Sequence, residues 1–356
     1  MSMDREILFR LLAARLRDET ALWLTRVLVF HDCTSNYLMR GRPDLLAQIP
    51  AQKTLFGAGP GKGMPIGNLN SQFFANVYLN GLDQFVKHEL RCRQYLRYCD
   101  DFVLLAESPE QLGDWRDRIE SFLRETLSLE LNPRQRLAPV ANGVDFLGYI
   151  VRRDYLLVRR RVVHHLQERL RAFEQQLVSP VEGGLRYAFD RSVLDELAAV
   201  LASYLGHFKI AAAWRLWAAL RRRFAFLAQY FAFDPADLRF VRTYPVPAGF
   251  LRAREQYAWF RRRYPGDVLF FQVGGFCEFY AGEDRAIARE LGLHPMGRNR
   301  RGAAFGFPCT RTDEFLRRLR ERQRSVLLIG ESPVAHARIR ARAPVARYRW
   351  GGNLAR

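Results

Sequence analysis

Two adjacent carboxylates, Asp100 and Asp101, lie between two short apolar runs, and no other stretch of the 356 residues constrains the fold as strongly. The runs, residues 95–98 and 102–105, are mostly aromatic and aliphatic, a composition that favours β-strands. Ionised neighbours repel each other and cannot be buried without partners, so we predict a tight hairpin with both carboxylates at its tip. Because side chains alternate along a strand, Asp100 and Asp101 point in opposite directions. Only one of them can then be the principal metal ligand, and we expect it to be the first, Asp100. An ordinary acidic turn has the same local pattern, so the neighbouring motifs must decide between the two interpretations.

The composition favours a polyanionic partner. The chain carries 56 Lys and Arg against 37 Asp and Glu, a formal charge of +19 that is contributed mostly by Arg, and Arg binds phosphate through a planar fork. The length predicts two or three domains, and an apolar share of 49% is that of a globular protein. No apolar run is long enough to span a membrane. Five cysteines without a CxxC pair favour reduced thiols in a cytoplasmic protein over a zinc site.

A turn and a long helix precede the predicted hairpin. The turn contains Pro65, Ile66 and Gly67, followed by Ser71 and Gln72, and Ser71 is the expected N-cap of the helix. Apolar residues then recur at helical spacing. This turn exposes backbone N–H groups, which can donate hydrogen bonds to the backbone of a template or nucleotide.

Two segments after the hairpin continue the pattern. Residues 132–136, which include Arg134, place cations close in sequence to the hairpin. Residues 144–150 predict a strand in which Gly148 lets another backbone approach closely.

Taken in order, the motifs of residues 64–150 resemble the palm of reverse transcriptases, whose Tyr-x-Asp-Asp hairpin matches Tyr98–Asp101. The resemblance implies that Asp100 and Asp101 are catalytic and bind Mg²⁺ in a two-metal site. It places nucleotide or template contacts at Pro65, Ile66, Gly67, Ser71, Gln72, Tyr98 and Arg134, and a primer grip at Phe146, Leu147 and Gly148. Among group II intron-type and related enzymes, the turn at residues 66–72 is similar to that of diversity-generating retroelements, which copy a template RNA with frequent errors opposite adenine.

The same resemblance implies a further catalytic Asp on a strand just before the first palm helix. Residues 1–4 correspond to the short segment that follows that strand, and Asp4 is expected to cap the helix that comes next. We therefore expect that the fingers and the first catalytic Asp lie upstream of Met1, so that the two-metal site is incomplete in this chain. On this interpretation, the chain alone binds primer-template but polymerises poorly.

The second half of the chain predicts a helical region and then an α/β domain. Three helices with Arg-rich polar faces occupy the position of the thumb, which in such enzymes holds the template-primer duplex. Farther along, Phe276 and Glu278 resemble the Phe-x-Glu motif in the amino-terminal mismatch-recognition domain of MutS proteins. That resemblance implies that Phe276 stacks on a mispaired base and that Glu278 hydrogen-bonds to it. Gly275 departs from the Asp that is usual in the family.

These inferences predict an α/β and α+β multidomain protein. Its expected parts are a partial polymerase palm (1–158), a helical thumb (159–242), a linker (243–249), a MutS domain I-like mixed α/β domain (250–335) and a flexible basic tail (336–356). The predicted function is RNA-directed DNA synthesis in the cytoplasm, with an RNA template, a DNA primer or cDNA, and dNTPs as partners. An accessory protein of the retroelement is a further candidate partner, and no membrane is involved. Two alternatives stay open: a non-catalytic protein that recognises mismatched or distorted duplex, and a basic scaffold for a partner protein.

Overall fold

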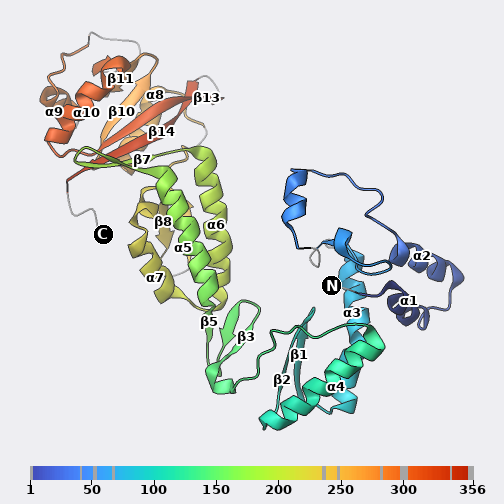
Figure 1. Ribbon diagram of the computed structural model, residues 1–356. Helices are drawn as coiled ribbons and strands as arrows, with labels where there is room; N and C mark the ends of the chain where they lie inside the picture. The colour runs from blue at the N-terminus through green and yellow to red at the C-terminus, as the bar shows by residue number, and fades with distance from the viewer. Residues whose placement is uncertain are drawn as a thin grey trace. The chain divides into compact units, whose positions relative to one another are not determined.

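Contacts within the chain define two units, Met1–Pro139 and Val140–Arg356 (Figure 1). The computed structural model describes residues 3–40, 42–50, 54–65, 69–234, 238–246, 249–280, 284–296, 304–336 and 339–351. Within these ranges no helix is both long and apolar enough to cross a membrane.

The first unit packs one β-hairpin against helices. Its elements are α1 (Arg5–Ala13), α2 (Glu19–Phe30), η1 (Pro43–Gln48), η3 (Leu55–Gly57), α3 (Leu69–Gln84), the π-helical turn η4 (Phe85–Glu89), β1 (Gln94–Tyr98), β2 (Asp101–Leu105) and α4 (Pro109–Leu127). Leu8 of α1, Tyr78 and Leu82 of α3, and Ile119 and Leu123 of α4 are buried together in its core. Each such side chain contributes about 1.5–3 kcal/mol by its burial. The predicted hairpin and the helices on either side of it are therefore present.

Helix caps explain where these helices begin, with one correction. The side chain of Asp4 accepts hydrogen bonds from the backbone N–H groups of Glu6 and Ile7, which confirms that Asp4 caps α1. Ser71 was expected to cap the helix before the hairpin, and this prediction is wrong. Because α3 already begins at Leu69, Ser71 lies within its first turn.

The second unit begins with a small three-stranded sheet and a helical bundle. Its elements are β3 (Val144–Phe146), β4 (Tyr149–Val151), β5 (Leu156–Val158), α5 (Arg160–Leu177), β6 (Val178–Val181), β7 (Gly184–Ala188), α6 (Arg191–Ile210), α7 (Trp214–Arg223), η6 (Ala225–Gln229), β8 (Phe231–Asp234) and β9 (Arg239–Arg242), with η5 (Val140–Asn142) at its start. The three helices predicted after residue 159 are present. The single strand predicted over residues 144–150 is instead the hairpin β3–β4, since the chain turns at Leu147 and Gly148.

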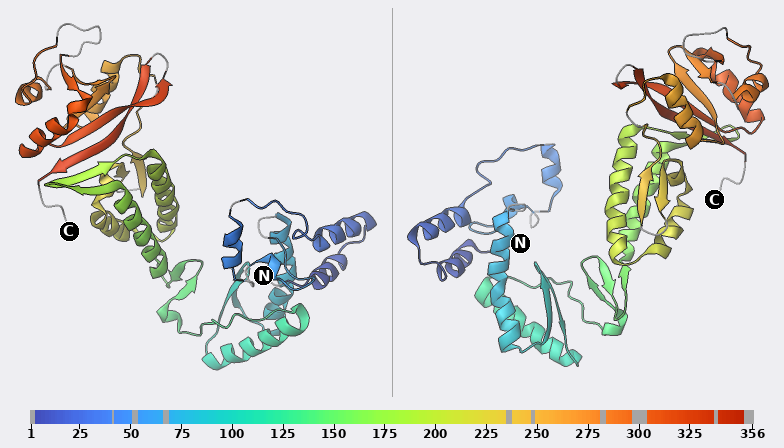
Figure 2. Two further views of the ribbon diagram at one scale, coloured as in Figure 1. Left: turned by 45° about the horizontal axis from the view of Figure 1, so that its top comes forward. Right: turned by 180° about the vertical axis from the view of Figure 1, so that it is seen from behind.

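A seven-stranded mixed sheet forms the rest of this unit, in the order β12-β11-β10-β13-β14-β7-β6. The remaining elements are α8 (Ala253–Arg263), β10 (Val268–Val273), β11 (Phe276–Phe279), α9 (Asp284–Glu290), β12 (Phe305–Pro308), η7 (Cys309–Arg311), α10 (Thr312–Glu321), β13 (Val326–His336) and β14 (Ile339–Trp350). Among the described strands of this sheet, β10 and β13 pair in parallel and the other neighbours pair antiparallel. Strand alternation sends Phe270 and Phe279 toward α9 and α10, and Phe271 and Tyr280 toward α8 on the other face (Figures 1 and 2).

Two expected boundaries are corrected by this sheet. Most of the segment expected to be a flexible basic tail forms β14, which pairs with β13 on one side and β7 on the other. The expected linker at 243–249 begins inside packed structure, because Tyr244 is buried in the core of the helical bundle. Since β6 and β7 come from the chain between α5 and α6, the sheet joins the helical bundle to the carboxyl-terminal elements without a break.

Candidate functional site

The carboxylate hairpin has the tight turn that the sequence predicts. Tyr98 pairs with Asp101 across β1 and β2, so Cys99 and Asp100 alone form the turn. Cys99 adopts a left-handed backbone with φ of 54°, a conformation that non-glycine residues adopt mainly in tight turns. Both Asp100 and Asp101 are exposed. The chain thus presents two carboxylates to solvent at one hairpin tip.

An ion pair between β1 and α3 holds this hairpin. The guanidinium of Arg97 donates to both carboxylate oxygens of Asp83, at 2.7 and 2.6 Å, and the hydroxyl of Tyr95 donates to Asp83 at 2.8 Å. Partial burial alone would raise the pKa of Asp83, but the hydrogen bonds from Arg97 and Tyr95 outweigh it and lower the pKa. The bond to Asp83 in turn raises the pKa of Arg97. Both groups therefore stay charged at neutral pH.

The same arginine fixes the turn itself. Nη1 of Arg97 donates to the carbonyl oxygen of Cys99 at 2.8 Å and to the side-chain oxygen of Asn76 at 3.2 Å. Asn76 and Asp83 are seven residues apart on α3 and so lie on one face of the helix. The carbonyl before Asp100 is thereby tied to α3. We did not predict this network; polar residues seven apart on a helix before a strand with an Arg are the signal for it.

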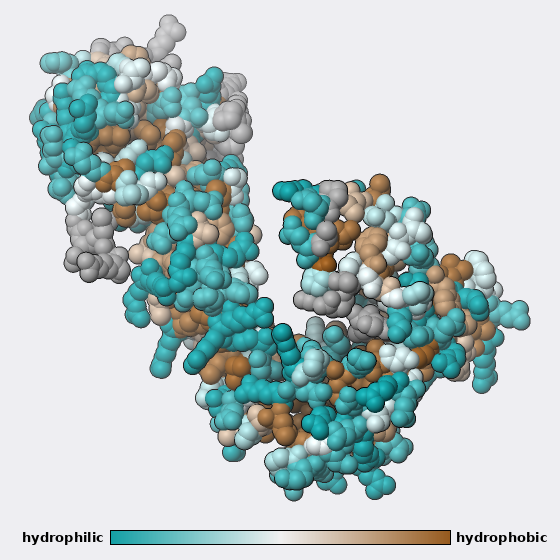
Figure 3. Space-filling model, viewed as in Figure 1, coloured by the Kyte–Doolittle hydropathy of each residue, from teal (hydrophilic) through white to brown (hydrophobic). Residues whose placement is uncertain are grey.

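The two faces of the hairpin differ in burial. Tyr95, Phe102 and Leu104 pack against the core of the first unit. On the opposite face Leu96 and Tyr98 are 58% and 59% exposed. Figure 3 shows brown, hydrophobic surface among teal over the part of the chain that carries β1 and β2. Exposed apolar side chains beside two carboxylates are typical of a surface that contacts another molecule.

The donor chemistry at the tip fits Mg²⁺, which prefers carboxylate oxygens. Asp100 and Asp101 could each supply such oxygens. Among the residues that the structure describes, however, no three His, Cys, Asp or Glu side chains come together as a metal site. The tip therefore offers two carboxylates of the kind that Mg²⁺ binds.

The residues expected to contact template or nucleotide have varied surroundings. Ile66 and Gly67 lie outside the described residues, Pro65 is half-buried and Gln72 is exposed. The hydroxyl of Ser71 is buried and has no hydrogen-bond partner among the described residues. Their roles stay predictions.

Arg134 and Tyr98, the other expected contacts, are both exposed. Arg134 lies in a turn in which its backbone N–H donates to the side chain of Asn132 at 3.0 Å. Its guanidinium is available to a phosphate.

The expected primer grip is the turn of the β3–β4 hairpin. Leu147 and Gly148 both have positive φ, of 50° and 89°, and Leu147 is exposed at the tip. A Cβ on Gly148 would lie 3.1 Å from Cε1 of His207 in α6. The positive φ of Gly148 favours glycine at this position, and its close neighbour is the side chain of His207, not the backbone that we expected. The ring of Tyr149 stacks on that of His207 with ring centres 4.2 Å apart, so the hairpin packs directly against α6.

The Phe-x-Glu segment is the start of β11. Val273 pairs with Phe276, so Gly274 and Gly275 form the turn between β10 and β11. Phe276 is 46% exposed, whereas Glu278 is only 4% exposed and accepts a hydrogen bond from the hydroxyl of Tyr280 at 2.8 Å. Phe276 is therefore placed to contact another molecule, while Glu278 is held within the α8 face of the sheet. Their contacts with a base stay predictions.

Glu331 of β13 holds the turn before Phe276. Its Oε1 accepts from the backbone N–H of Gly274 at 2.9 Å and from Nη2 of Arg342 at 2.8 Å, and Arg340 donates to Oε2 at 3.1 Å. Burial alone would raise the pKa of Glu331, but the Gly274 hydrogen bond and the two arginines together lower it. The guanidinium of Arg342 also lies 5.1 Å from the ring centre of Phe271. We did not predict this network, because Arg340 and Arg342 were assigned to a flexible tail.

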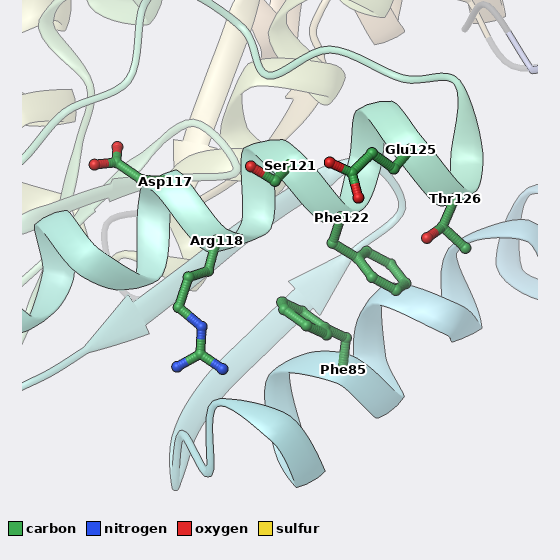
Figure 4. A pocket seen from close by; sticks show the side chains of 7 residues that line it. All are labelled: Phe85, Asp117, Arg118, Ser121, Phe122, Glu125 and Thr126. Carbon is green, nitrogen blue, oxygen red and sulfur yellow. The ribbon is translucent and has the colours of Figure 1, made fainter.

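A hollow of about 430 Å³ beside α4 carries no comparable arrangement (Figure 4). Phe85 and Phe122 stack there with ring centres 4.4 Å apart, while Asp117 and Ser121 point away from them. Its polar groups do not converge, so we assign no chemistry to it.

Comparisons with known families agree with this geometry. Residues 12–151 match the model of the reverse transcriptase (RNA-dependent DNA polymerase) family, and residues 252–346 match that of MutS domain I. A search of curated proteins finds no match to the chain. Both resemblances are thus confirmed at the level of the domain family: the chain contains a reverse transcriptase domain that carries the Asp100–Asp101 hairpin and a MutS domain I that carries Phe276.

Proposed function

We propose that the protein is an RNA-directed DNA polymerase that uses Asp100 and Asp101 to hold Mg²⁺. The observation that carries the proposal is the hairpin tip, where two exposed carboxylates follow a turn that Arg97 ties to α3. The match of residues 12–151 to the reverse transcriptase family supports the same activity.

The residues of the site have separable tasks. Arg97 positions the turn, and Asp100 within the turn and Asp101 directly after it present carboxylate oxygens. A bound Mg²⁺ would stabilise the charge on the attacking and leaving oxygens of nucleotide transfer. Exposed cations such as Arg134 and the arginines of α7 would bind the phosphates of template and primer.

We further propose that the enzyme belongs to a diversity-generating retroelement and makes error-prone cDNA. This rests on the turn at residues 66–72, which has Ile where most bacterial reverse transcriptases have Gln. The test is the error spectrum of the cDNA: an excess of substitutions opposite adenine supports this type, and an even spectrum contradicts it.

Primer extension on an RNA template tests the polymerase proposal. We expect low but Mg²⁺-dependent DNA synthesis, and we expect Asp100→Asn to lower it further by at least about a hundredfold, because losing a metal-binding charge costs several kcal/mol. Glu107→Gln is the matched control, since Glu107 is an exposed carboxylate just beyond the end of β2. Synthesis that survives Asp100→Asn would contradict the proposal.

The alternative is a non-catalytic protein that recognises mismatched duplex. One observation favours it: Phe276 stands exposed beside a turn that Glu331 holds in place. An aromatic wedge opens a weakly stacked base step more cheaply than a paired one.

Duplex binding separates the two functions. The alternative predicts that Phe276→Ala removes a preference for mismatched over paired duplex, whereas Asp100→Asn leaves that preference unchanged. Phe56→Ala is the matched control, because Phe56 is 49% exposed, close to the value for Phe276. A mismatch preference that persists in Phe276→Ala would rule out this use of the MutS-like domain.

A further inference from the structure

A second hollow, of about 1120 Å³, lies in the second unit between β5, the start of α5 and the turn from α6 to α7. Leu156, Val158 and Leu216 supply apolar lining, and the small side chains of residues 211–213 leave the space open. Its volume exceeds the roughly 300–1,000 Å³ of small-molecule sites. It can therefore hold more than one ring system.

Aromatic side chains stand exposed in this hollow. Tyr155 is 56% exposed and Trp214 is 39% exposed, and both line it. Large exposed aromatics lose the benefit of burial, and they are typical of surfaces on which a ligand stacks. Around the start of α5, Figure 3 shows brown and teal surface side by side.

The charge of the lining is of one sign. Arg160, Arg161 and Arg215 line the hollow together with His164, and none of the described lining residues is acidic. All three arginines are exposed, and none of them forms an ion pair within the described part of the chain. Elsewhere on α5, Arg169 is paired with Glu196. The three arginines at the hollow are thus left for an anionic ligand, whereas His164 lies 3.1 Å from the carboxylate of Glu168 on the same helix.

Two helix starts add to this positive potential. In the described structure α5 begins beside Arg159 and α7 beside Ala213, and neither has a side-chain cap or an acidic residue in its first turn. A helix start with unused N–H groups attracts anions. Arginines at the first turn of a helix oppose its dipole, a cost that an anionic ligand would offset.

We propose that this hollow binds an unpaired segment of nucleic acid, with bases stacked on Trp214 and Tyr155 and phosphates on Arg160, Arg161 and Arg215. Aromatic faces beside a row of cations are the general means of binding single strands. A duplex keeps its base faces stacked on one another, so it cannot use the two rings in this way. The hollow is thus a site for single-stranded template, primer or cDNA, and its use does not depend on synthesis.

Fluorescence anisotropy with the full chain tests this site, using labelled dT12 and a blunt mixed-sequence duplex as probes. We expect Trp214→Ala to weaken dT12 binding about tenfold, because one stacked base contributes that much, and to change duplex binding less than twofold. Trp214→Phe keeps a stacking face and should restore most of the affinity. Trp23→Ala, at a tryptophan 65% exposed in the first unit, is the matched control.

The arginines give an independent readout. In Arg160→Gln/Arg161→Gln, the slope of log Kd against log salt for dT12 should fall by about 1.4, since each phosphate contact contributes roughly 0.7. Arg15→Gln/Arg17→Gln, an exposed pair of arginines in the first unit and outside the hollow, should leave the slope unchanged. Circular dichroism checks that each variant is folded.

Several results would overturn the proposal. These are dT12 binding that is unchanged in folded Trp214→Ala, an equal loss of duplex binding, or an equal loss in the control variants. A mass by light scattering that rises with concentration and returns to the monomer in Trp214→Ala would assign the hollow to a second copy of the chain instead. All of these results are independent of whether the protein extends a primer.

Discussion

Two hairpin turns, one in each unit, present the residues to which we assign function, and they are held by opposite charges. At the β1–β2 turn, Arg97 donates to the carbonyl of Cys99 and is paired with Asp83. At the β10–β11 turn, Glu331 accepts from the amide of Gly274 and is paired with Arg342. In both cases a charged side chain from outside the turn binds its backbone. An ion pair can thus serve to fix a loop as well as to stabilise a fold.

The turns differ in what else supports them. Within the described residues β1 and β2 form a two-stranded sheet, whereas β10 and β11 lie inside a sheet of seven strands. A two-stranded hairpin is marginal by itself and needs packing or other ties. We therefore expect the β1–β2 turn to depend strongly on its ion pair and the β10–β11 turn to depend on its own only weakly.

Arg97→Ala should have the largest effect, because it leaves Asp83 partly buried without its partner. We expect the β1–β2 hairpin to lose about 2 to 3 kcal/mol of local stability, seen as roughly 30- to 150-fold faster amide hydrogen exchange in residues 94–105. Arg93→Ala, at an exposed arginine, should change exchange little. Unchanged exchange in Arg97→Ala would mean that packing alone holds the turn.

Glu331→Gln should have a smaller effect. The amide oxygen can still accept from Gly274, but the attraction to Arg340 and Arg342 is lost, and neighbouring strands keep β10 and β11 in place. We expect the β10–β11 turn to lose about 1 to 2 kcal/mol of local stability, measured as faster hydrogen exchange at the amide of Gly274. Glu321→Gln, at an exposed carboxylate at the end of α10, is the control. A loss of local stability as large as that in Arg97→Ala would contradict the expectation that the β10–β11 turn depends less on its ion pair than the β1–β2 turn does.

The stability difference between Glu331→Gln and the native protein should depend on pH in one direction. The pKa of Glu331 is lowered in the folded protein, so its stabilising effect is complete above the unfolded pKa and is lost as the pH falls through the lower, folded value. The exchange ratio of Glu331→Gln to the native protein should therefore be largest near neutral pH and approach one in acid. Taking a ratio at each pH cancels the chemical pH dependence of exchange.

The sequence predicts these turns well and their supports poorly. Apolar runs on both sides of Asp100 and Asp101 define the β1–β2 hairpin, and the pair Gly274–Gly275 is typical of a turn, because both signals are local. The partners Asp83 and Glu331 are distant in sequence, 14 and 57 residues from the groups they bind. Such pairings depend on how elements pack. Polar residues seven apart on a helix indicate the Asp83 network, whereas no local pattern indicates that Glu331 binds the β10–β11 turn.

The basic tail shows the same limit. Arg340, Arg342 and Arg347 gave residues 336–356 the composition of a solvated arm. In the structure these arginines lie on β14, where Arg342 is paired with Glu331 and Arg347 with the buried Asp267. A charged strand can lie inside a sheet only when its neighbours supply the counter-charges, and those neighbours are up to 80 residues away.

The smallest effects test the two glycines of the β10–β11 turn. Gly274 has φ of 61°, so Gly274→Ala should cost about 1 kcal/mol although no atom lies within 4 Å of the added Cβ. Gly275 lacks a positive φ and also faces open space, so Gly275→Asp, which introduces the residue usual in MutS proteins, should change stability by less than about 0.5 kcal/mol. Hydrogen exchange of residues 268–279 measures both variants. If Gly275→Asp were as costly as Gly274→Ala, side-chain space rather than backbone conformation would decide which residues this turn accepts. If it is neutral, the missing Asp reflects what the turn binds, not how it folds.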